Sequence, residues 1–271
     1  MDQHFSASQG ASLIRRDLFP TLIYGPVGSR RLGMSLGINP LPLDVKLCSF
    51  NCPYCQFGWT DMYVGDVGEA PDEVFPSVGA VGAALEEALE ELVADGTRLD
   101  SLTIAGNGEP TLHPEFAELV DVVAAVRDRL VPQVKLSILT CGSTLHRPEV
   151  LEALNRLDER HVKLDAGDPE TLWAVNLPHP PFDLDRMIAH IPGLTDCILQ
   201  SMFVQGRVDN TTDEVVAAWI AKVAQIRPLA VQAYTLDRIP ADKSLEPTPM
   251  ARLNAIARRC REATGVACEV Y

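Results

Sequence analysis

Short β-branched segments alternate with longer amphipathic segments along this chain, and this alternation constrains the fold more than any other feature. Six segments are typical of strands and are bounded by Gly, Pro, Asn or Asp: residues 35–39, 101–105, 133–139, 160–165, 197–204 and 229–236. A helical pattern follows each of them. Such alternation predicts parallel strands that are joined by right-handed crossovers.

Apolar residues recur at helical spacing between these strands. In the clearest case, Val78, Val81 and Leu85 follow one another at three- and four-residue steps. This helix is expected over residues 77–94, with Ser77 as its N-cap. Further helices are expected at residues 114–128, 147–156, 183–191, 212–226 and 247–263.

These units predict a partial (βα)6 barrel. Six units are fewer than the eight of a closed barrel, and we favour the partial barrel over a doubly wound open sheet. With 271 residues and 46% hydrophobic content, the chain fits a single domain, residues 1–271. We expect its core at about 24–240, a short N-terminal extension at 1–23, and a C-terminal helix and tail at 241–271. In either architecture, reactive groups belong at the carboxyl ends of the strands.

The segment KLCSFNCPYCQFGW, residues 46–59, contains three of the chain's seven cysteines. No apolar run approaches the roughly 18 residues of a membrane span. The first residues lack the apolar stretch of a signal peptide, so we expect a cytoplasmic protein with no membrane partner. Disulfides are rare in that reducing compartment, and clustered cysteines there indicate metal binding or catalysis.

The three cysteines, Cys48, Cys52 and Cys55, follow the first predicted strand, where Pro53 argues against a long helix. A structural zinc site needs four ligands, and no histidine or fourth cysteine lies near this loop in the sequence. Iron–sulfur clusters are also held by thiolates, and a cluster with three protein ligands leaves one iron open. The loop therefore predicts an iron–sulfur site, with a zinc module or a non-catalytic iron–sulfur redox sensor as alternatives.

The C-x3-C-x2-C spacing, with Tyr54 before the last cysteine, resembles the signature of the radical S-adenosylmethionine (SAM) superfamily. The resemblance implies a [4Fe-4S] cluster on Cys48, Cys52 and Cys55, and SAM as the second cofactor, with Tyr54 among the residues that bind it. One-electron reduction would cleave SAM, and the resulting 5′-deoxyadenosyl radical would abstract hydrogen from a substrate. An electron donor such as flavodoxin or ferredoxin is implied as a partner.

The segment AGNGEPTLHPEF, residues 105–116, follows the second predicted strand. Its glycines permit a sharp turn and a close approach to a ligand, although an ordinary strand-to-helix turn is the alternative. In radical SAM proteins a Gly-Glu-Pro loop in this position contacts the methionyl amino group, which implies this role for Glu109. The implied cofactor-binding loop consists of Gly106, Asn107, Gly108, Glu109 and Pro110.

Further segments resemble one branch of the superfamily, the wyosine-type tRNA-modifying synthetase-like proteins and their uncharacterised bacterial relatives. These segments are residues 24–39, 140–150, 163–180 and 232–240. By position, the likeness implies that polar side chains at the strand ends line the cofactor cleft: Ser137, Lys163, Asp165, Gln200, Asn210, Asp237 and Arg238. Each of them is alternatively a strand-end cap or an ion-pair partner.

Two features depart from the tRNA-modifying branch. Its members have additional cysteines ahead of the signature for a second cluster, whereas this chain has none before Cys48. The formal net charge is -14, and an acidic surface repels phosphate backbones. We therefore expect a small-molecule or peptide substrate, with tRNA nucleoside modification as the enzymatic alternative.

A fourth cysteine follows the third predicted strand. Relatives usually have Thr-Asn-Gly there, where this chain has Thr140, Cys141 and Gly142. A thiol at the mouth of a radical barrel can return a hydrogen atom to a substrate radical, so Cys141 is a candidate catalytic hydrogen donor. The alternative is a small residue that is tolerated in a turn.

Overall fold

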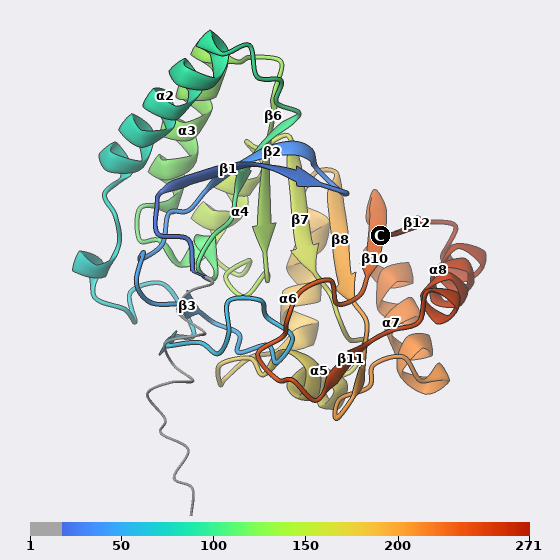
Figure 1. Ribbon diagram of the computed structural model, residues 1–271. Coiled ribbons are helices and arrows are strands. Elements are labelled where there is room, and N and C mark those ends of the chain that lie inside the picture. Colours follow the sequence, from blue (N-terminus) through green and yellow to red (C-terminus); the bar gives the residue numbers. More distant parts are fainter. Residues whose placement is uncertain (1–17) are drawn as a thin grey trace, which may run out of the picture.

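The six predicted strands lie in one eight-stranded sheet in the computed structural model, which describes residues 18–271 (Figure 1). The strand order is β1-β2-β5-β6-β7-β8-β10-β12, and every neighbouring pair is parallel except β1 with β2. The strands are β1 Ile23–Ser29, β2 Gly33–Ile38, β5 Ser101–Ile104, β6 Lys135–Thr140, β7 Glu159–Lys163, β8 Cys197–Met202, β10 Ala230–Tyr234 and β12 Ala267–Val270. Most of the expected N-terminal extension lies outside the described residues.

Helices connect the parallel strands, as the sequence predicts. They are α2 Val78–Ala94, α3 Phe116–Leu130, α4 Pro148–Leu154, α5 Pro169–Asn176, α6 Leu184–His190, α7 Asp213–Ile226 and α8 Met250–Thr264. The six predicted strands correspond to β2, β5, β6, β7, β8 and β10, which confirms the partial (βα)6 barrel. The sheet does not close, since β1 and β12 remain at its edges.

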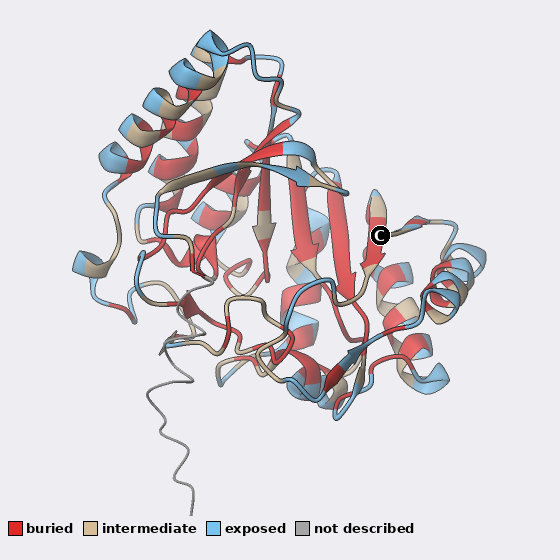
Figure 2. Cartoon of the chain, viewed as in Figure 1, coloured by how far each residue is buried: buried red, intermediate tan, exposed pale blue. Residues whose placement is uncertain are grey.

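Each longer helix buries an apolar stripe against the sheet and leaves its opposite face in solvent (Figure 2). In α2 the stripe includes Val81, Leu85 and Leu89, all fully buried. The Ser77 hydroxyl accepts a hydrogen bond from the Ala80 amide at 3.2 Å, which confirms the predicted N-cap. Among the described residues, no helix is both long and apolar enough to cross a bilayer.

Several elements differ from the prediction. The segment expected to be a polar strand end and loop, residues 163–180, contains the helix α5, which begins after the N-cap Asp168. The expected C-terminal tail contains β12, which pairs with β10. The predicted strand at 197–204 is divided into β8 and the short strand β9 Val204–Gly206, which pairs with β11 Leu245–Pro247. These elements are short, so tertiary contacts decide them more than local pattern does.

Candidate functional site

The three-cysteine loop begins at β3, Leu47–Cys48, a two-residue strand beside the carboxyl ends of β2 and β5. It pairs with β4, Met62–Tyr63, so that the chain between the two strands forms a closed loop. Cys48 and Cys52 are buried, whereas Cys55 is half-buried. The loop turns tightly at its tip, where the Cys55 amide donates to the Cys52 carbonyl at 3.0 Å. The cysteines therefore lie at the end of the barrel where reactive groups are expected.

The predicted cofactor loop, residues 106–110, holds the cysteine loop in place through backbone hydrogen bonds. The Leu47 amide donates to the Asn107 carbonyl at 2.9 Å, and the Glu109 amide donates to the Leu47 carbonyl at 3.0 Å. Gly108 lies between these bonds at φ +147°, and a Cβ there would be 1.6 Å from the Leu47 carbonyl oxygen. Only glycine permits this approach. The glycines were expected to allow a close approach to a ligand, and in the structure Gly108 makes its close contact with β3.

Glu109 joins this loop to the end of β6. Its Oε1 accepts from the hydroxyls of Thr111 and Thr140, each at 2.6 Å, and its Oε2 accepts from the Cys141 amide at 2.6 Å. The side chain is 2% exposed, and no cation pairs with it among residues 18–271. Oε2 accepts only this one hydrogen bond, so it retains capacity for a further donor.

Two lysines place positive charge beside the cysteines. Lys46 is 2% exposed and donates to the Gly58 carbonyl at 2.7 Å. Burial opposes its charge, but the thiols of Cys55, Cys48 and Cys52 outweigh that effect and raise the pKa of Lys46. Burial raises the pKa of Cys48 to about 12, with Lys46 opposing the rise. Neighbouring cations of this kind favour the thiolate form that metal binding requires.

Asp165 organises the other side of the cysteine loop. It accepts hydrogen bonds from the Tyr54 hydroxyl, from Asn176 Nδ2 at 2.7 Å and from the Met202 amide at 2.7 Å. Asn176 Nδ2 also lies 3.4 Å from the sulfur of Cys52. Because Asp165 is 1% exposed and fully bonded, it fixes Tyr54 between the last two cysteines.

Lys163 is the second lysine near the loop. Its Nζ is 3.7 Å from Asp165 Oδ2 and 5.1 Å from the centre of the Tyr54 ring. Burial opposes its charge, but Asp165 outweighs that effect and raises the pKa of Lys163. Its side chain is 22% exposed, so part of this lysine reaches solvent near the cysteines.

Cys141 lies against the start of the cysteine loop. Its sulfur is 3.3 Å from the Ser49 hydroxyl and 3.4 Å from the Ser143 hydroxyl, and Ser49 directly follows Cys48. Burial raises the pKa of Cys141 well above its usual value, and the carboxylate of Glu109 adds to the rise. The thiol is therefore protonated near neutral pH.

The remaining predicted residues are not all at this site. Ser137 is fully buried on β6, and its hydroxyl has no partner among the described residues. Gln200 donates to Gln232 at 2.9 Å within the sheet, and Arg238 is exposed on the loop after β10. Asn210 does reach the site, because its Nδ2 donates to the Asp165 carbonyl at 2.9 Å.

Two residues at the site were not predicted from the sequence. Lys46 is a buried lysine two positions before Cys48, and burial of lysine is rare unless it is paired. Its nearness to the cysteines is the one signal that could have identified it. Asn176 is supplied by α5, so the missed helix concealed it.

The donor set is compatible with an iron–sulfur cluster, because thiolates are the usual protein ligands of its irons. Among residues 18–271, no three His, Cys, Asp or Glu side chains converge closely enough to bind one ion. A cluster does not need such convergence, because each thiolate binds a separate iron. Asn176 Oδ1 is buried without a partner in the described part of the chain, beside Cys52. Thiol donors and two nearby lysines fit the implied group, whereas the Asn176 oxygen needs a donor that the sulfurs of a cluster do not offer.

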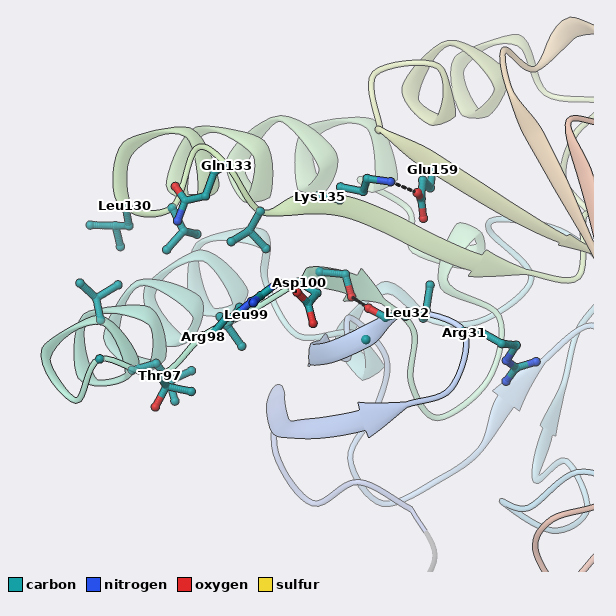
Figure 3. Close-up of a pocket in the computed structure, with 17 residues that line it drawn as sticks. Arg31, Leu32, Thr97, Arg98, Leu99, Asp100, Leu130, Gln133, Lys135 and Glu159 are labelled. Atoms are coloured by element: carbon teal, nitrogen blue, oxygen red, sulfur yellow. Dashed lines mark hydrogen bonds and ion pairs between the residues drawn. The ribbon is translucent and has the colours of Figure 1, made fainter. Parts of the chain in front are cut away.

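A cavity of about 770 Å³ lies elsewhere, at the amino-terminal ends of β5, β6 and β7 (Figure 3). Two ion pairs lie in its lining: Arg98 lies 3.2 Å from Asp100, and Lys135 binds Glu159. No residue of the cysteine loop lines this cavity. The cavity is therefore separate from the candidate functional site.

Comparison with known proteins identifies the family. Residues 45–216 match the radical SAM superfamily model. A UPF0026 protein of Helicobacter pylori is 31% identical over 81% of this chain and 67% of its own length, and one of Methanocaldococcus jannaschii is 29% identical over 90% and 73%. The chain therefore belongs to the radical SAM superfamily and, within it, to the UPF0026 proteins. The resemblance inferred from the cysteine spacing is confirmed.

Solved structures show the same fold at low sequence identity. A radical SAM methyltransferase from Sphaerobacter thermophilus aligns with a TM-score of 0.65 and 15% identity, over 88% of this chain and 65% of its own. SuiB of Streptococcus suis, bound to a precursor peptide, aligns with a TM-score of 0.59 and 13% identity, over 87% and 48%. TYW1 aligns with a TM-score of 0.57 and 14% identity, over 84% and 73%. The barrel of this chain is thus of the radical SAM type.

Proposed function

We propose that this protein is an enzyme that reductively cleaves SAM at a [4Fe-4S] cluster on Cys48, Cys52 and Cys55. The 5′-deoxyadenosyl radical would then abstract hydrogen from a small molecule or a peptide. The observation that carries the proposal is a loop of three thiols with two lysines beside it. When bound, the reduced cluster would supply the electron for SAM cleavage.

The residues of the chain prepare the site for these groups. Lys46 and Lys163 offset the negative charge of the cysteine thiolates. Asp165 and Asn176 hold Tyr54 and Cys52 in a fixed arrangement. Such prior fixing of the ligands reduces the reorganisation that binding would otherwise require.

Glu109 is the proposed partner of the methionyl amino group. Its Oε2 has capacity for one further donor, and its fixed position beside β6 requires no rearrangement. We assign the surrounding loop to SAM binding as well: Gly106, Asn107, Gly108 and Pro110. We also assign Tyr54 and Asp165, which are hydrogen-bonded to each other, to SAM binding. Ser137, Gln200 and Arg238 are further candidates for SAM binding that lie outside this group of contacts.

The charge of the chain bears on the substrate. A net charge of -14 disfavours tRNA, whose binding depends largely on neutralising phosphates. SuiB, which has this fold, was solved with a precursor peptide. A small molecule or peptide is therefore the proposed substrate class, with flavodoxin or ferredoxin as the electron donor in the cytoplasm.

Anaerobic SAM cleavage tests this function. Protein reconstituted with iron and sulfide is incubated with SAM and dithionite, and 5′-deoxyadenosine is quantified. The proposal predicts that the nucleoside forms in a protein-dependent manner. Binding of iron and sulfide without any cleavage contradicts it and supports a redox sensor, and recovery of zinc alone supports a structural module.

Cys141 is expected to return the hydrogen atom of its S–H bond to the substrate radical, and the thiyl radical that remains would be restored to the thiol by one electron from the flavodoxin or ferredoxin donor and one proton from solvent. Its raised pKa keeps the thiol in the S–H form, and this hydrogen exchanges with solvent. Turnover in deuterated water should therefore label the product, and the label should be lost in Cys141→Ala. Cys197→Ala, a change at another buried cysteine on β8, is the control and should keep the label. An unchanged label in Cys141→Ala excludes the donor role.

A further inference from the structure

The hairpin of β1 and β2 crosses the open side of the barrel. The two strands pair antiparallel, and their turn follows Ser29. Figure 1 shows the hairpin in blue lying across the sheet towards β10. At the turn, Arg30 Nη2 lies 3.4 Å from Asp237 Oδ2, just after β10. The first two strands of the sheet therefore reach its sixth parallel strand across the gap that the incomplete barrel leaves.

Arg31, the next residue of the turn, is held differently from Arg30. Its guanidinium carbon lies 4.2 Å from the centre of the Tyr234 ring, a cation–π contact. Figure 3 shows the guanidinium pointing away from the labelled residues that line the cavity. Within residues 18–271 Arg31 forms no ion pair, and its Nη1 is buried without a hydrogen-bond partner. A buried guanidinium nitrogen without an acceptor is costly, so this group is poised for an acceptor that a ligand supplies.

Lys163 lies on the same face of the sheet as Tyr234, the residue that Arg31 contacts. It is in register with Gln200, which is in register with Gln232 and bonded to it. Tyr234 is two residues beyond Gln232 and therefore points to the same side. The one acid paired with Lys163, Asp165, already accepts three hydrogen bonds, so the ammonium group keeps capacity for another anion.

We infer that Arg31 and Lys163 bind an anionic group of the substrate, a carboxylate or a phosphate, at the open side of the barrel beside the cysteine loop. The inference rests on the proposed function, because it places the substrate next to the cofactor. The planar guanidinium of Arg31 offers paired N–H donors that suit either anion. Its contact with the Tyr234 ring helps to hold it in position. The negative charge of the chain as a whole makes this local positive charge selective for small anions over polynucleotides.

A thermal titration tests the site. The melting temperature of the full chain, reconstituted with iron and sulfide, is measured with increasing inorganic phosphate or acetate at constant ionic strength and without SAM. A ligand that binds only the folded state raises the melting temperature with concentration. The wild type should respond to at least one anion, and the one that acts distinguishes phosphate from carboxylate. In Arg31→Gln the apparent affinity should fall about tenfold or more.

Arg30→Gln is the matched control, because it removes the same charge one residue away from an arginine that already has a carboxylate partner. It should respond as the wild type does. If Arg31→Gln does not fold, Arg31→Lys should keep part of the response. Equal responses in all variants, no response in the wild type, or Arg31-dependent binding of tRNA alone would each overturn the inference. SAM cleavage is not part of this measurement, so failure of the proposed function is detected separately.

Discussion

Replacing any one of Cys48, Cys52 or Cys55 by Ala is expected to abolish formation of 5′-deoxyadenosine and to lower the iron content of the reconstituted protein. The three thiols are the proposed ligands of the cluster, so removal of one leaves too few ligands. Changes that merely disturb the orientation of metal ligands cost about 10- to 100-fold, and loss of a ligand should exceed this range.

The control for these variants is Cys197→Ala, since Cys197 is a buried cysteine on β8 that points away from the loop. Burial raises its pKa to about 12, with the neighbouring Arg160 opposing the rise. This variant should retain iron and SAM cleavage. Iron and nucleoside at wild-type levels in any of the three loop variants would show that the loop does not hold the cluster.

Gly108→Ala is expected to disrupt both the fold near the site and its activity. At φ +147° an alanine is strained, and its Cβ would overlap the Leu47 carbonyl oxygen, which is backbone and cannot turn aside. We expect a loss of about 3 kcal/mol or more in the free energy of unfolding. For a chain of this size, that corresponds to a fall of about 6–12 °C in the melting temperature, measured by circular dichroism.

The matched control is Gly79→Ala in α2. Gly79 is helical, and a Cβ there meets no atom within 4 Å. Alanine is favoured over glycine in a helix by about 0.5–1 kcal/mol, so this variant should be slightly more stable than the wild type. A difference of about 2 °C in melting temperature corresponds to about 1 kcal/mol or less for a chain of this size. If the melting temperatures of Gly108→Ala and Gly79→Ala differ by no more than this, the proposed docking of β3 on residues 106–110 is wrong.

The regular part of the fold was predictable from the sequence because its signals are local. The six parallel strands are short apolar runs with clear boundaries, and α2 has both an apolar stripe and an N-cap. The elements that were missed have fewer such signals, although Asp168 does cap the N-terminus of α5. The helix α5 buries only Leu172, Val175 and Asn176, and β12 has four residues, so pairing with β10 decides its structure.

The parts of the candidate site that depend on the spacing of residues along the chain were predictable from the sequence. The burial of individual side chains was not. The cysteine spacing located the loop, and the structure places residues 106–110, which the sequence assigns to cofactor binding, next to it. Alternation along a strand shows which face a residue occupies but not how deeply it lies. Ser137 was assigned to the cleft by its position in the family resemblance, and in the structure its hydroxyl is fully buried without a partner among residues 18–271. The contact of Arg31 with Tyr234 spans the barrel gap, and no local pattern reports such a contact.

The open iron is the central claim, and electron paramagnetic resonance tests it most directly. The reconstituted protein is reduced with dithionite, and spectra are recorded with and without excess SAM. If three cysteines leave one iron available, SAM binds there and shifts the g values of the [4Fe-4S]+ signal. A cluster signal that is identical with and without SAM would contradict the account, because it would show that no iron is open to the cofactor.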